Sequence, residues 1–374
     1  MAHIKRLHFQ HFRNAEQLRC ELGTGLNLFI GDNAAGKTSV LEALWFLATG
    51  RSFRNAQIGQ LIQHSHPQTT LFIELHSQRQ PLNPLRIGVQ RQAQHNLMRL
   101  NGENVRAHSE IAQHLPLQLL TPESHRLLEE GPNARRQFMD WGCFYQFADF
   151  IQLWRQQKRL LKQRNQALKQ RLPAQQIQLW DAPLVESAIQ IDQMRRHYLE
   201  GLTPLLQDYC QTLMPELSES VVCHYRAGWP KGNDDLLGLF KDNLGRDLAL
   251  GHTQYGAHRA DIRFRFGGQE AMQKLSRGQQ KLFVCALLLA QAKLHQNLTE
   301  EPAIMLIDDL PAELDATHRH TLLKLLAELN IQHIVTSTAL NLIPLIHPSS
   351  IKAWKIEQGV LQALNLEKST SPEI

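Results

Sequence analysis

The stretch GDNAAGKTS, residues 31–39, decides the fold of this chain. It matches the pattern G-x-x-x-x-G-K-[ST], the phosphate-binding loop of nucleotide hydrolases. The residues before it, 25–30, are mostly apolar and predict a buried strand, and residues 39–49 predict a helix. This strand–loop–helix order lets backbone N–H groups and a helix N-terminus point together at phosphate oxygens.

Each position of the loop has a physical role in this interpretation. Gly31 and Gly36 let the backbone bend inward, Lys37 reaches the β- and γ-phosphates, and the Thr38 hydroxyl binds Mg²⁺. The alternative is a glycine-containing turn that merely precedes an ordinary helix. The strand and helix on either side favour the nucleotide site.

Composition describes a globular protein with a substantial core. The chain has 374 residues, of which 43% are hydrophobic and 20% charged. No run approaches the ~18–20 apolar residues of a membrane span, and the N-terminus lacks the apolar segment of a secretion signal. Five scattered cysteines without a C-x-x-C pair indicate free thiols in a reducing cytoplasm. The net charge of +5 permits a polyanionic partner without requiring one.

Hydrophobic periodicity divides the chain into two domains of different character. Short strands and helices alternate up to residue 121 and again after residue 256, which predicts one α/β domain with a mixed sheet from residues 1–121 and 256–374. The first two strands, over residues 4–10 and 17–22, are expected to join the sheet of the phosphate-binding loop. Residues 122–255 are rich in Gln, Arg, Lys and Leu and predict an inserted, mostly helical arm.

Two aspartates follow the apolar run IMLI at residues 304–307. Ligands bind at the carboxyl ends of the strands in such sheets, so Asp308 is expected to hold the Mg²⁺ shell and Asp309 to orient the attacking water. The alternative is a strand that simply ends in two aspartates, one of which caps the next helix.

The segment LSRGQ, residues 275–279, precedes a long apolar helix. A serine at that position can cap free N–H groups, and with Gly278 it can form a second phosphate-binding helix N-terminus. Such an end would suit the γ-phosphate side of a nucleotide held by a neighbouring chain. On spacing alone, a simple helix cap is an equally good explanation of Ser276.

Together these motifs resemble the ATP-binding-cassette (ABC) ATPases of the SMC/Rad50 type, and in particular the RecF family of bacterial DNA-repair ATPases. The resemblance covers nearly the whole chain. Further matching segments are FRN (12–14), LEAL (41–44), GRSFR (50–54), TPE (121–123), GPNARRQFMDWG (131–142), KRLLKQRN (158–165), HRADIR (258–263) and PAELD (311–315).

The resemblance implies an ABC-type P-loop ATPase head that binds ATP and Mg²⁺. It implies catalytic roles for Lys37, Asp308 and Asp309, with Thr38 and Asp308 serving the metal. Asp315 would face the dimer. The residues implied to surround the nucleotide are Arg13, Asn14, Gly31, Asp32, Asn33, Ala34, Ala35, Gly36, Lys37, Thr38 and Ser39; those implied to complete the site of the paired chain are Leu275, Ser276, Arg277, Gly278 and Gln279.

The resemblance also implies partners. Two heads would close around two ATP molecules as an ATP-dependent homodimer and grip DNA, double- and single-stranded, at gap junctions. Hydrolysis would release the DNA. Members of this family work with RecO and RecR and, indirectly, with RecA, in the cytoplasm and without a membrane partner.

The chain departs from the family pattern at several positions. Ala34 and Ala35 stand where a glycine usually follows the asparagine, and Asp309 replaces the usual Glu, which predicts slow turnover. Ser337 and Thr338 occupy the place of a switch histidine, and His333 fits a sheet position better. The glutamine-loop residue stays open between Gln118 and Glu123.

A basic helix face is the predicted DNA contact. No acid occurs between Asp149 and Asp181, and the residues at 155, 158, 159 and 162 share one side of a helix opposite its leucines. A solvated basic face is the simpler alternative. The residues of the predicted contact are Arg155, Lys158, Arg159 and Lys162, with Arg51 and Arg54; Arg135 and Arg136 are possible additions.

Two other functions share part of these motifs. A transporter ATPase subunit would have the same nucleotide motifs, but the long helical insertion disfavours it. A DNA-junction binder with a vestigial ATPase would tolerate the Asp309 and histidine departures. A GTPase is disfavoured because no N-K-x-D motif is present.

Overall fold

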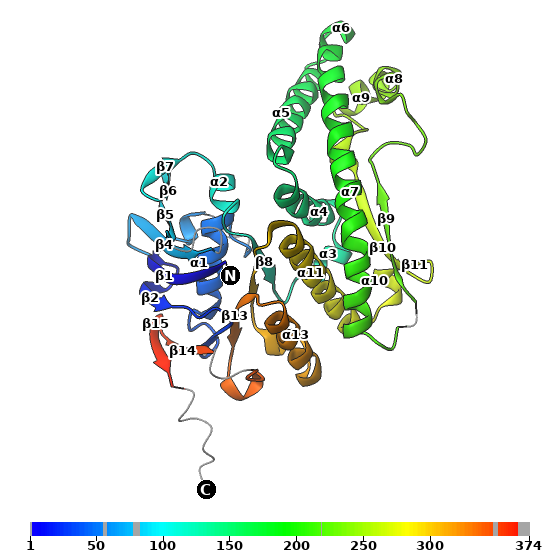
Figure 1. The fold of residues 1–374 in the computed structure, drawn as a ribbon. Helices are drawn as coiled ribbons and strands as arrows, with labels where there is room; N and C mark the ends of the chain where they lie inside the picture. The colour runs from blue at the N-terminus through cyan, green and yellow to red at the C-terminus, as the bar shows by residue number, and fades with distance from the viewer. Residues whose placement is uncertain (1, 55–57, 78–82, 218, 347–350, 366–374) are drawn as a thin grey trace. The chain divides into compact units, whose positions relative to one another are not determined.

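The structure, a computed structural model, describes residues 2–54, 58–77, 83–217, 219–346 and 351–365. The chain forms two compact units (Figure 1). The first comprises Met1–Ser124 and Lys281–Ile374, and the second comprises His125–Gln280. Each unit is described by itself below.

A mixed, six-stranded sheet carries the phosphate-binding loop in the first unit. Its order is β15-β14-β3-β13-β12-β8, and all neighbours run parallel except β14 and β15. Four of the strands, β3, β8, β12 and β13, are buried along nearly their whole length, as parallel strands covered on both faces are. The bounds are β3 Leu26–Ile30, β8 Leu117–Leu120, β12 Ile304–Ile307, β13 Gln332–Ser337, β14 Lys352–Glu357 and β15 Val360–Leu364.

A second, antiparallel sheet of six strands belongs to the same unit, in the order β2-β1-β4-β5-β6-β7. The expectation that the first two strands join the loop sheet is therefore wrong. They pair with each other, and β1 pairs with β4, because the chain turns back at Arg13 before it enters β3. The bounds are β1 His3–Phe12, β2 Ala15–Glu21, β4 Gln68–His76, β5 Leu85–Gln92, β6 Asn96–Leu100 and β7 Glu103–Val105.

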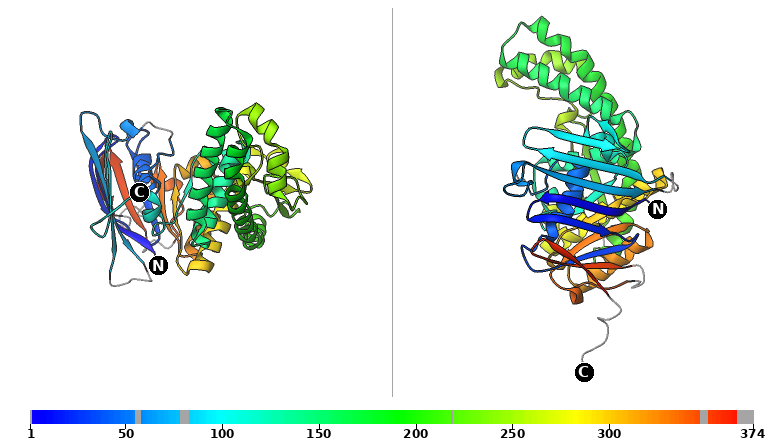
Figure 2. Two further views of the ribbon diagram at one scale, coloured as in Figure 1. Left: turned by 90° about the horizontal axis from the view of Figure 1, so that it is seen from above. Right: turned by 90° about the vertical axis from the view of Figure 1, so that its left-hand side faces the viewer.

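Helix α1, Lys37–Thr49, lies between the two sheets (Figure 2). Val40, Leu41, Leu44 and Leu47 of this helix share one buried core with side chains from both sheets, including Phe29 of β3. Because α1 is apolar nearly all round, it is stable only with a sheet on either side. The other helices of this unit are η1 Ile58–Gln60, α2 His108–Ala112, α12 Leu310–Glu313, α13 Ala316–Glu328, η4 Leu340–Leu342 and most of α11, Arg277–Thr299.

The second unit is mostly helical, with one small sheet in the order β11-β10-β9. The predicted boundary at residue 256 is wrong, since the second unit continues to Gln280. The reason is that β10 pairs along its whole length with β9 of the arm. Its elements are α3 Arg126–Glu129, α4 Pro132–Gln146, α5 Phe150–Lys169, α6 Ala174–Ile177, η2 Gln178–Trp180, α7 Asp181–Leu213, β9 Val221–Arg226, α8 Leu236–Asp242, α9 Leu244–Leu250, η3 Ala257–Arg259, β10 Asp261–Phe266, β11 Gln269–Glu270 and α10 Ala271–Lys274.

Buried arginines connect the elements of the second unit. Arg164 of α5 is completely buried, and its guanidinium donates to Asp181 at 2.7 Å and to Asp247 at 2.6 Å. Arg135 of α4 forms a two-pronged pair with Asp261 of β10 at 2.8 and 3.1 Å, and Arg136 donates to the Ala260 carbonyl at 2.8 Å. Arg135 is thus buried in an internal ion pair and is not available to a DNA surface, whereas Arg136 is only partly buried.

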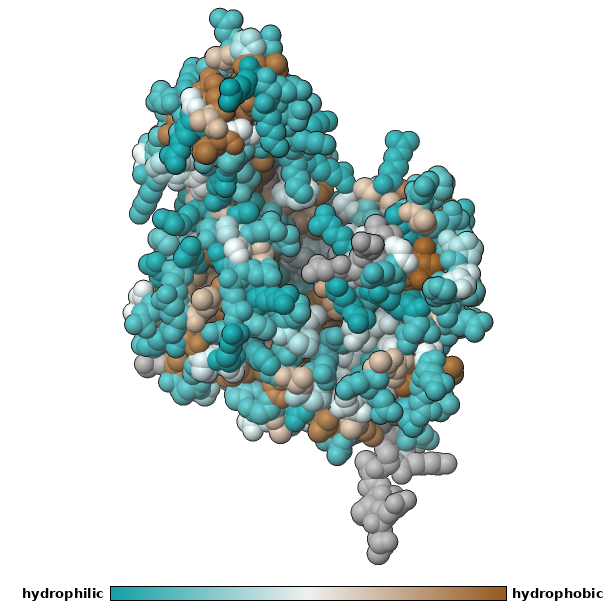
Figure 3. Space-filling view, turned by 180° about the vertical axis from the view of Figure 1, so that it is seen from behind, coloured by the Kyte–Doolittle hydropathy of each residue, from teal (hydrophilic) through white to brown (hydrophobic). Residues whose placement is uncertain are grey.

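Among the described residues, only a few large hydrophobic side chains are exposed. The face in Figure 3 is mainly hydrophilic, with scattered hydrophobic areas. Within the described part of the chain, no helix combines the length and the apolar character needed to cross a membrane. The exposed large hydrophobic residues are Leu97, Leu179, Ile189, Val222, Leu250, Met272, Leu298 and Val360.

We predict that Arg164→Met destabilises the second unit by about 3–5 kcal/mol, because it leaves two buried carboxylates without their partner. Burial already raises the pKa of Asp181, against the opposing effect of Arg164. Hydrogen exchange of the α5 and α7 amides measures the loss. Lys162→Ala, an exposed position on the same helix, is the control and should leave exchange unchanged. Equal protection in both variants would contradict the prediction.

Candidate nucleotide site

The loop between β3 and α1 depends on its two glycines. A Cβ at Gly31 would lie 2.3 Å from the Ile356 carbonyl oxygen of β14. Gly36 caps α1 with φ 114°, in the left-handed region that favours glycine. The sequence pattern therefore corresponds to two separate constraints, a close backbone approach at Gly31 and a left-handed bend at Gly36.

Ala34 also adopts a left-handed conformation, with φ 67°. A Cβ in this region crowds the following carbonyl, which costs roughly 1–2 kcal/mol. The alanine thus keeps the backbone that a glycine would adopt at this place, at the expense of local strain. Ala35 has no such conformation, and its carbonyl accepts from the Gly359 N–H of the β14–β15 turn at 3.1 Å.

Lys37 is folded over the loop that contains it. Its side chain is 8% exposed, and Nζ donates to the carbonyls of Gly31 at 2.7 Å and Asp32 at 2.8 Å. The side chains of Asp32 and Asn33 are exposed. The two carbonyls hold the Lys37 ammonium at the centre of the loop, where a phosphate group can accept from it.

Asp308 and Thr38 meet at the end of β12. The Thr38 hydroxyl donates to the Asp308 carboxylate, at 2.9 Å to Oδ1 and 3.2 Å to Oδ2. Thr336 of β13 donates to Asp308 Oδ1 at 2.8 Å. Burial raises the pKa of Asp308, while the bonds from Thr336 and Thr38 oppose that shift. A carboxylate that is desolvated and aligned with a loop threonine is well suited to a divalent cation.

The donor set fits magnesium rather than a metal held by protein alone. Within the described ranges, no group of three or more His, Cys, Asp or Glu could hold a metal ion. Mg²⁺ is usually bound by one or two protein oxygens together with substrate phosphates and water. Thr38 and Asp308 would supply those protein oxygens.

Asp309 has a left-handed backbone conformation at the start of α12. It caps α12 with φ 49°, and its N–H donates to the Thr336 hydroxyl at 2.8 Å. The Thr336 hydroxyl therefore contacts both aspartates: it donates to the Asp308 carboxylate and accepts from the Asp309 N–H. The Asp309 side chain is only partly buried, in contrast to Asp308.

A pocket of 630 Å³ opens beside the loop. Asn14 accepts from the Ser39 hydroxyl at 3.3 Å and donates to the Ala34 carbonyl at 3.4 Å. Arg13 and Asn14 therefore lie beside the loop; their predicted place next to the nucleotide stays a prediction. The lining residues are Arg13, Asn14, Ala34, Gly36, Lys37, Thr38, Ser39, Arg54, Gly59, Gln60, Ile62 and His64.

Glu42 of α1 organises the wall of this pocket. Its side chain is fully buried and pairs with Arg13 through two bonds, at 2.5 and 2.8 Å, and it also accepts from the Ser52 hydroxyl. Arg54 lies 3.9 Å from the same carboxylate. Arg54 thus lines the nucleotide pocket, which differs from its predicted place on a DNA surface, whereas Arg51 is exposed.

The segment Leu275–Gln279 belongs to the second unit. Leu275 is buried, whereas Ser276, Arg277 and Gly278 are exposed at the start of α11. Ser276 Oγ accepts from the Gln279 N–H at 3.3 Å, and Gln279 Oε1 accepts from the Ser276 N–H at 3.0 Å. Arg277 pairs with Glu129. Ser276 therefore caps the helix.

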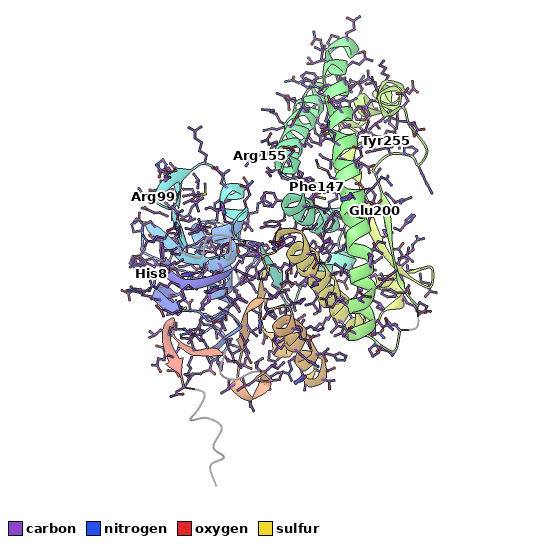
Figure 4. The ribbon with its side chains drawn as sticks, in the orientation of Figure 1. His8, Arg99, Phe147, Arg155, Glu200 and Tyr255 are labelled. Atoms are coloured by element: carbon purple, nitrogen blue, oxygen red, sulfur yellow. The ribbon has the colours of Figure 1, made fainter. Side chains whose placement is uncertain are left out.

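The predicted basic face on α5 is exposed in the second unit. Arg155, labelled in Figure 4, is exposed, as are Lys158, Arg159 and Lys162. Lys158 Nζ lies 3.8 Å from the centre of the Trp154 ring.

Gln118 and Glu123, the two candidates for the glutamine-loop residue, and His333 all belong to the first unit. Gln118 is 3% exposed and donates to Gln291 at 3.2 Å, so its side chain is held within the core. Glu123 is exposed and follows β8, and the Asp308 N–H donates to the carbonyl of Leu120, the last residue of β8. His333 is buried within β13, and burial lowers its pKa to about 4. It is a residue of the sheet.

Sequence reasoning missed Thr336, Glu42 and Gly359. Thr336 is the second-last residue of the buried strand β13, and a hydroxyl near the carboxyl end of a parallel strand was an available signal. Glu42 was a lone acid in an apolar helix. The approach of Gly359 to the loop had no local signal, because it depends on how distant strands pair.

The chain is similar in sequence and in structure to known proteins. A family model described as the RecF/RecN/SMC N terminal domain matches residues 3–358. The DNA replication and repair protein RecF of Hydrogenovibrio crunogenus is 58% identical over 361 residues, covering 96% of this chain and 99% of that protein. The protein of the same description from Shewanella loihica is 40% identical over 358 residues, covering 95% and 98%. A solved structure of the recombination mediator protein RecF-ATP in the RecFOR pathway has 25% identity, a TM-score of 0.86 and coverage of 97% and 98%.

The fold and the loop geometry define an ABC-type P-loop ATPase head with an inserted helical arm. Given the match along almost its whole length and the identity to its relatives, the chain belongs to the RecF family within the RecF/RecN/SMC group.

We predict that Ala34→Gly stabilises the protein by about 1 kcal/mol, because it relieves the left-handed strain at φ 67°. Ala35→Gly is the matched control. It relieves no strain and adds freedom to the unfolded chain, so it should leave stability unchanged or lower it by about 0.5–1 kcal/mol. Thermal unfolding of both variants distinguishes them, and a fall in stability for Ala34→Gly would refute the idea.

We predict that Asp308→Asn raises stability without nucleotide by about 0.5–2 kcal/mol at pH 7, as changes that relieve a strained site commonly do. Its amide oxygen can still accept from Thr38 and Thr336. Since burial raises the folded-state pKa, the ionised carboxylate opposes folding at neutral pH. The gain should vanish as the pH falls below the ordinary Asp pKa of about 3.9. Thermal unfolding against pH measures this, and a gain independent of pH would contradict it.

Proposed function

We propose that this protein is an ATP-dependent DNA-binding switch that acts in replication and repair. The observation that carries the proposal is the Thr38–Asp308 contact at 2.9 Å beside the buried Lys37 ammonium. It combines a phosphate-binding loop with a desolvated carboxylate for Mg²⁺, which is the arrangement that phosphoryl transfer requires.

In this proposal ATP occupies the pocket of the first unit. Lys37 exchanges its carbonyl partners for the β- and γ-phosphates, and Thr38 and Asp308 hold Mg²⁺. The Arg13–Glu42 pair and Asn14 form the wall beside the nucleotide. The relative solved as RecF-ATP supports ATP as the ligand.

Asp309 is proposed to orient the attacking water. Its partly exposed carboxylate follows buried Asp308, and the Thr336 hydroxyl fixes its backbone. An aspartate reaches less far than a glutamate, so turnover should be slow and suited to a timed release. Mg²⁺ would neutralise charge on the γ-phosphate, and Asp309 would accept hydrogen bonds from water in line with it.

ATP is proposed to pair two chains. The start of α11 presents Ser276 and Gly278 to solvent, and its N–H groups and helix dipole favour a phosphate. A γ-phosphate held by Lys37 of one chain would be contacted by these residues of the other. Asp315, the cap of α13, would face the dimer.

DNA is proposed as the partner of the paired form. Relatives are described as DNA replication and repair proteins, and one as a recombination mediator in the RecFOR pathway, which supports action at gapped DNA with RecO and RecR and, indirectly, RecA. The exposed basic side chains of α5 suit phosphate contacts. Arg51 is a further candidate, and the protein is proposed to work in the cytoplasm.

Light scattering with Mg²⁺-ATP tests the switch. We expect an Asp309→Asn variant, which binds but does not hydrolyse ATP, to shift from monomer to dimer. Adding Ser276→Arg should keep ATP binding and prevent the shift, because a bulky side chain then stands at the helix start. Adding Lys37→Ala should abolish both ATP binding and the shift.

ATP binding is measured separately, by fluorescent nucleotide titration. A dimer formed by the Ser276→Arg variant would refute pairing through this helix end. A monomer in all variants, with ATP bound, would refute ATP-driven pairing itself.

A further inference from the structure

No described helix of the first unit covers the outward face of its antiparallel sheet, whose strands lie at the front of the right-hand view in Figure 2. Alternate residues of each strand enter the core, among them Leu71 and Ile73 of β4 and Ile87 and Val89 of β5. The residues between them, including Phe72 and Gly88, therefore face outward.

The strand register lines up one row of side chains across this face. His8 lies opposite Arg19 and opposite Phe72, Phe72 lies opposite Gly88, and Gly88 lies opposite Arg99. His8 and Arg99 are labelled in Figure 4, on β1 and β6. The row thus combines one aromatic ring with basic side chains on both sides.

A groove of 810 Å³ lies over part of this row. Gly88 forms its floor between Phe72 and Arg99, and since neighbouring strands are about 4.8 Å apart, the two side chains are about 10 Å apart. A Cβ added at Gly88 would meet only the Leu71 carbonyl oxygen, at 3.9 Å. The backbone here does not need glycine, so the missing side chain serves mainly to keep the groove open.

The charge of the groove is positive. Arg86 and Arg99 line it, and none of its described lining residues has a carboxylate. Among the described residues neither arginine forms an ion pair, although Arg99 donates to Asn104 at 3.3 Å. Glu74 of β4 lies opposite Arg86 in the strand register, but it is 8% exposed and accepts from Arg6 at 3.3 Å.

We propose that this groove binds the unpaired nucleotides of single-stranded DNA. A base would stack on the Phe72 ring above Gly88, and Arg86 and Arg99 would contact the flanking phosphates. Aromatic rings on a positively charged surface bind single strands in this way, whereas the base faces of a duplex are not available for stacking. The inference extends the proposed DNA function, but the groove is separate from the nucleotide pocket and needs no ATP.

The test is fluorescence anisotropy of a labelled oligo-dT with the full-length protein and no nucleotide. Phe72→Ala should weaken binding by about ten-fold or more, since stacking on one aromatic ring contributes that much. Arg86→Ala with Arg99→Ala should lower the slope of log K against log salt by about 1.4, or about 0.7 for each lost phosphate contact. Gly88→Leu should block binding by filling the groove while keeping every other contact.

Arg19→Ala is the matched control, because it removes the same charge from the same sheet face outside the groove lining. It should change affinity less than two-fold, by about 0.4 kcal/mol or less. If Arg19→Ala weakened oligo-dT binding as much as Arg99→Ala does, binding would be explained by general electrostatic attraction to the whole sheet face. That result would overturn the proposal. Oligo-dT binding by Gly88→Leu at the level of the unaltered protein would overturn it as well.

Duplex binding with Mg²⁺-ATP separates this inference from the proposed switch. Phe72→Ala should leave it intact, while changes at Lys158 and Lys162 should weaken it. Loss of duplex binding in the α5 variants with oligo-dT binding retained supports two separate surfaces. If Phe72→Ala weakens duplex and single strand equally, base stacking is not the contact and the inference fails.

Discussion

The hydrogen bond from Thr38 to Asp308 joins residues 270 positions apart, and the nucleotide site depends on it. It connects the start of α1 to the end of β12, and Thr336 adds β13 to the same carboxylate. A buried carboxylate without such donors would be costly. These two hydroxyls therefore fix the distance between the phosphate loop and the strand ends, although the whole helical arm intervenes in the sequence.

The sequence predicted correctly those parts of the fold in which a residue's role depends on the residues next to it in the chain. The loop, its strand and helix, and the pair Asp308–Asp309 all belong to this class. Partnership between distant strands was not predictable in the same way. The alternation in residues 4–10 marks a strand, but nothing in it specifies pairing with β4 rather than β3, and DIRFRF gives no sign that β10 pairs with β9.

The roles of the charged residues were also difficult to predict, because arginines on the same helix, α5, have different environments. Arg159 is exposed, whereas Arg164 is buried between two aspartates. The distinction was available in the spacing, since Arg164 lies four residues after Leu160 and four before Leu168, on the apolar side. The acids that pair with it come from α7 and α9, and those contacts could not be read from the sequence.

The position of β3 between β13 and β14 has a consequence for how the protein is made. The strand that leads into the phosphate loop is synthesised early, but both of its neighbours come from the last part of the chain, and the turn that bonds to Ala35 comes later still. The loop strand can therefore complete its hydrogen bonding only after residues 332–357 have been synthesised, so the phosphate loop lacks its neighbouring strands for most of translation.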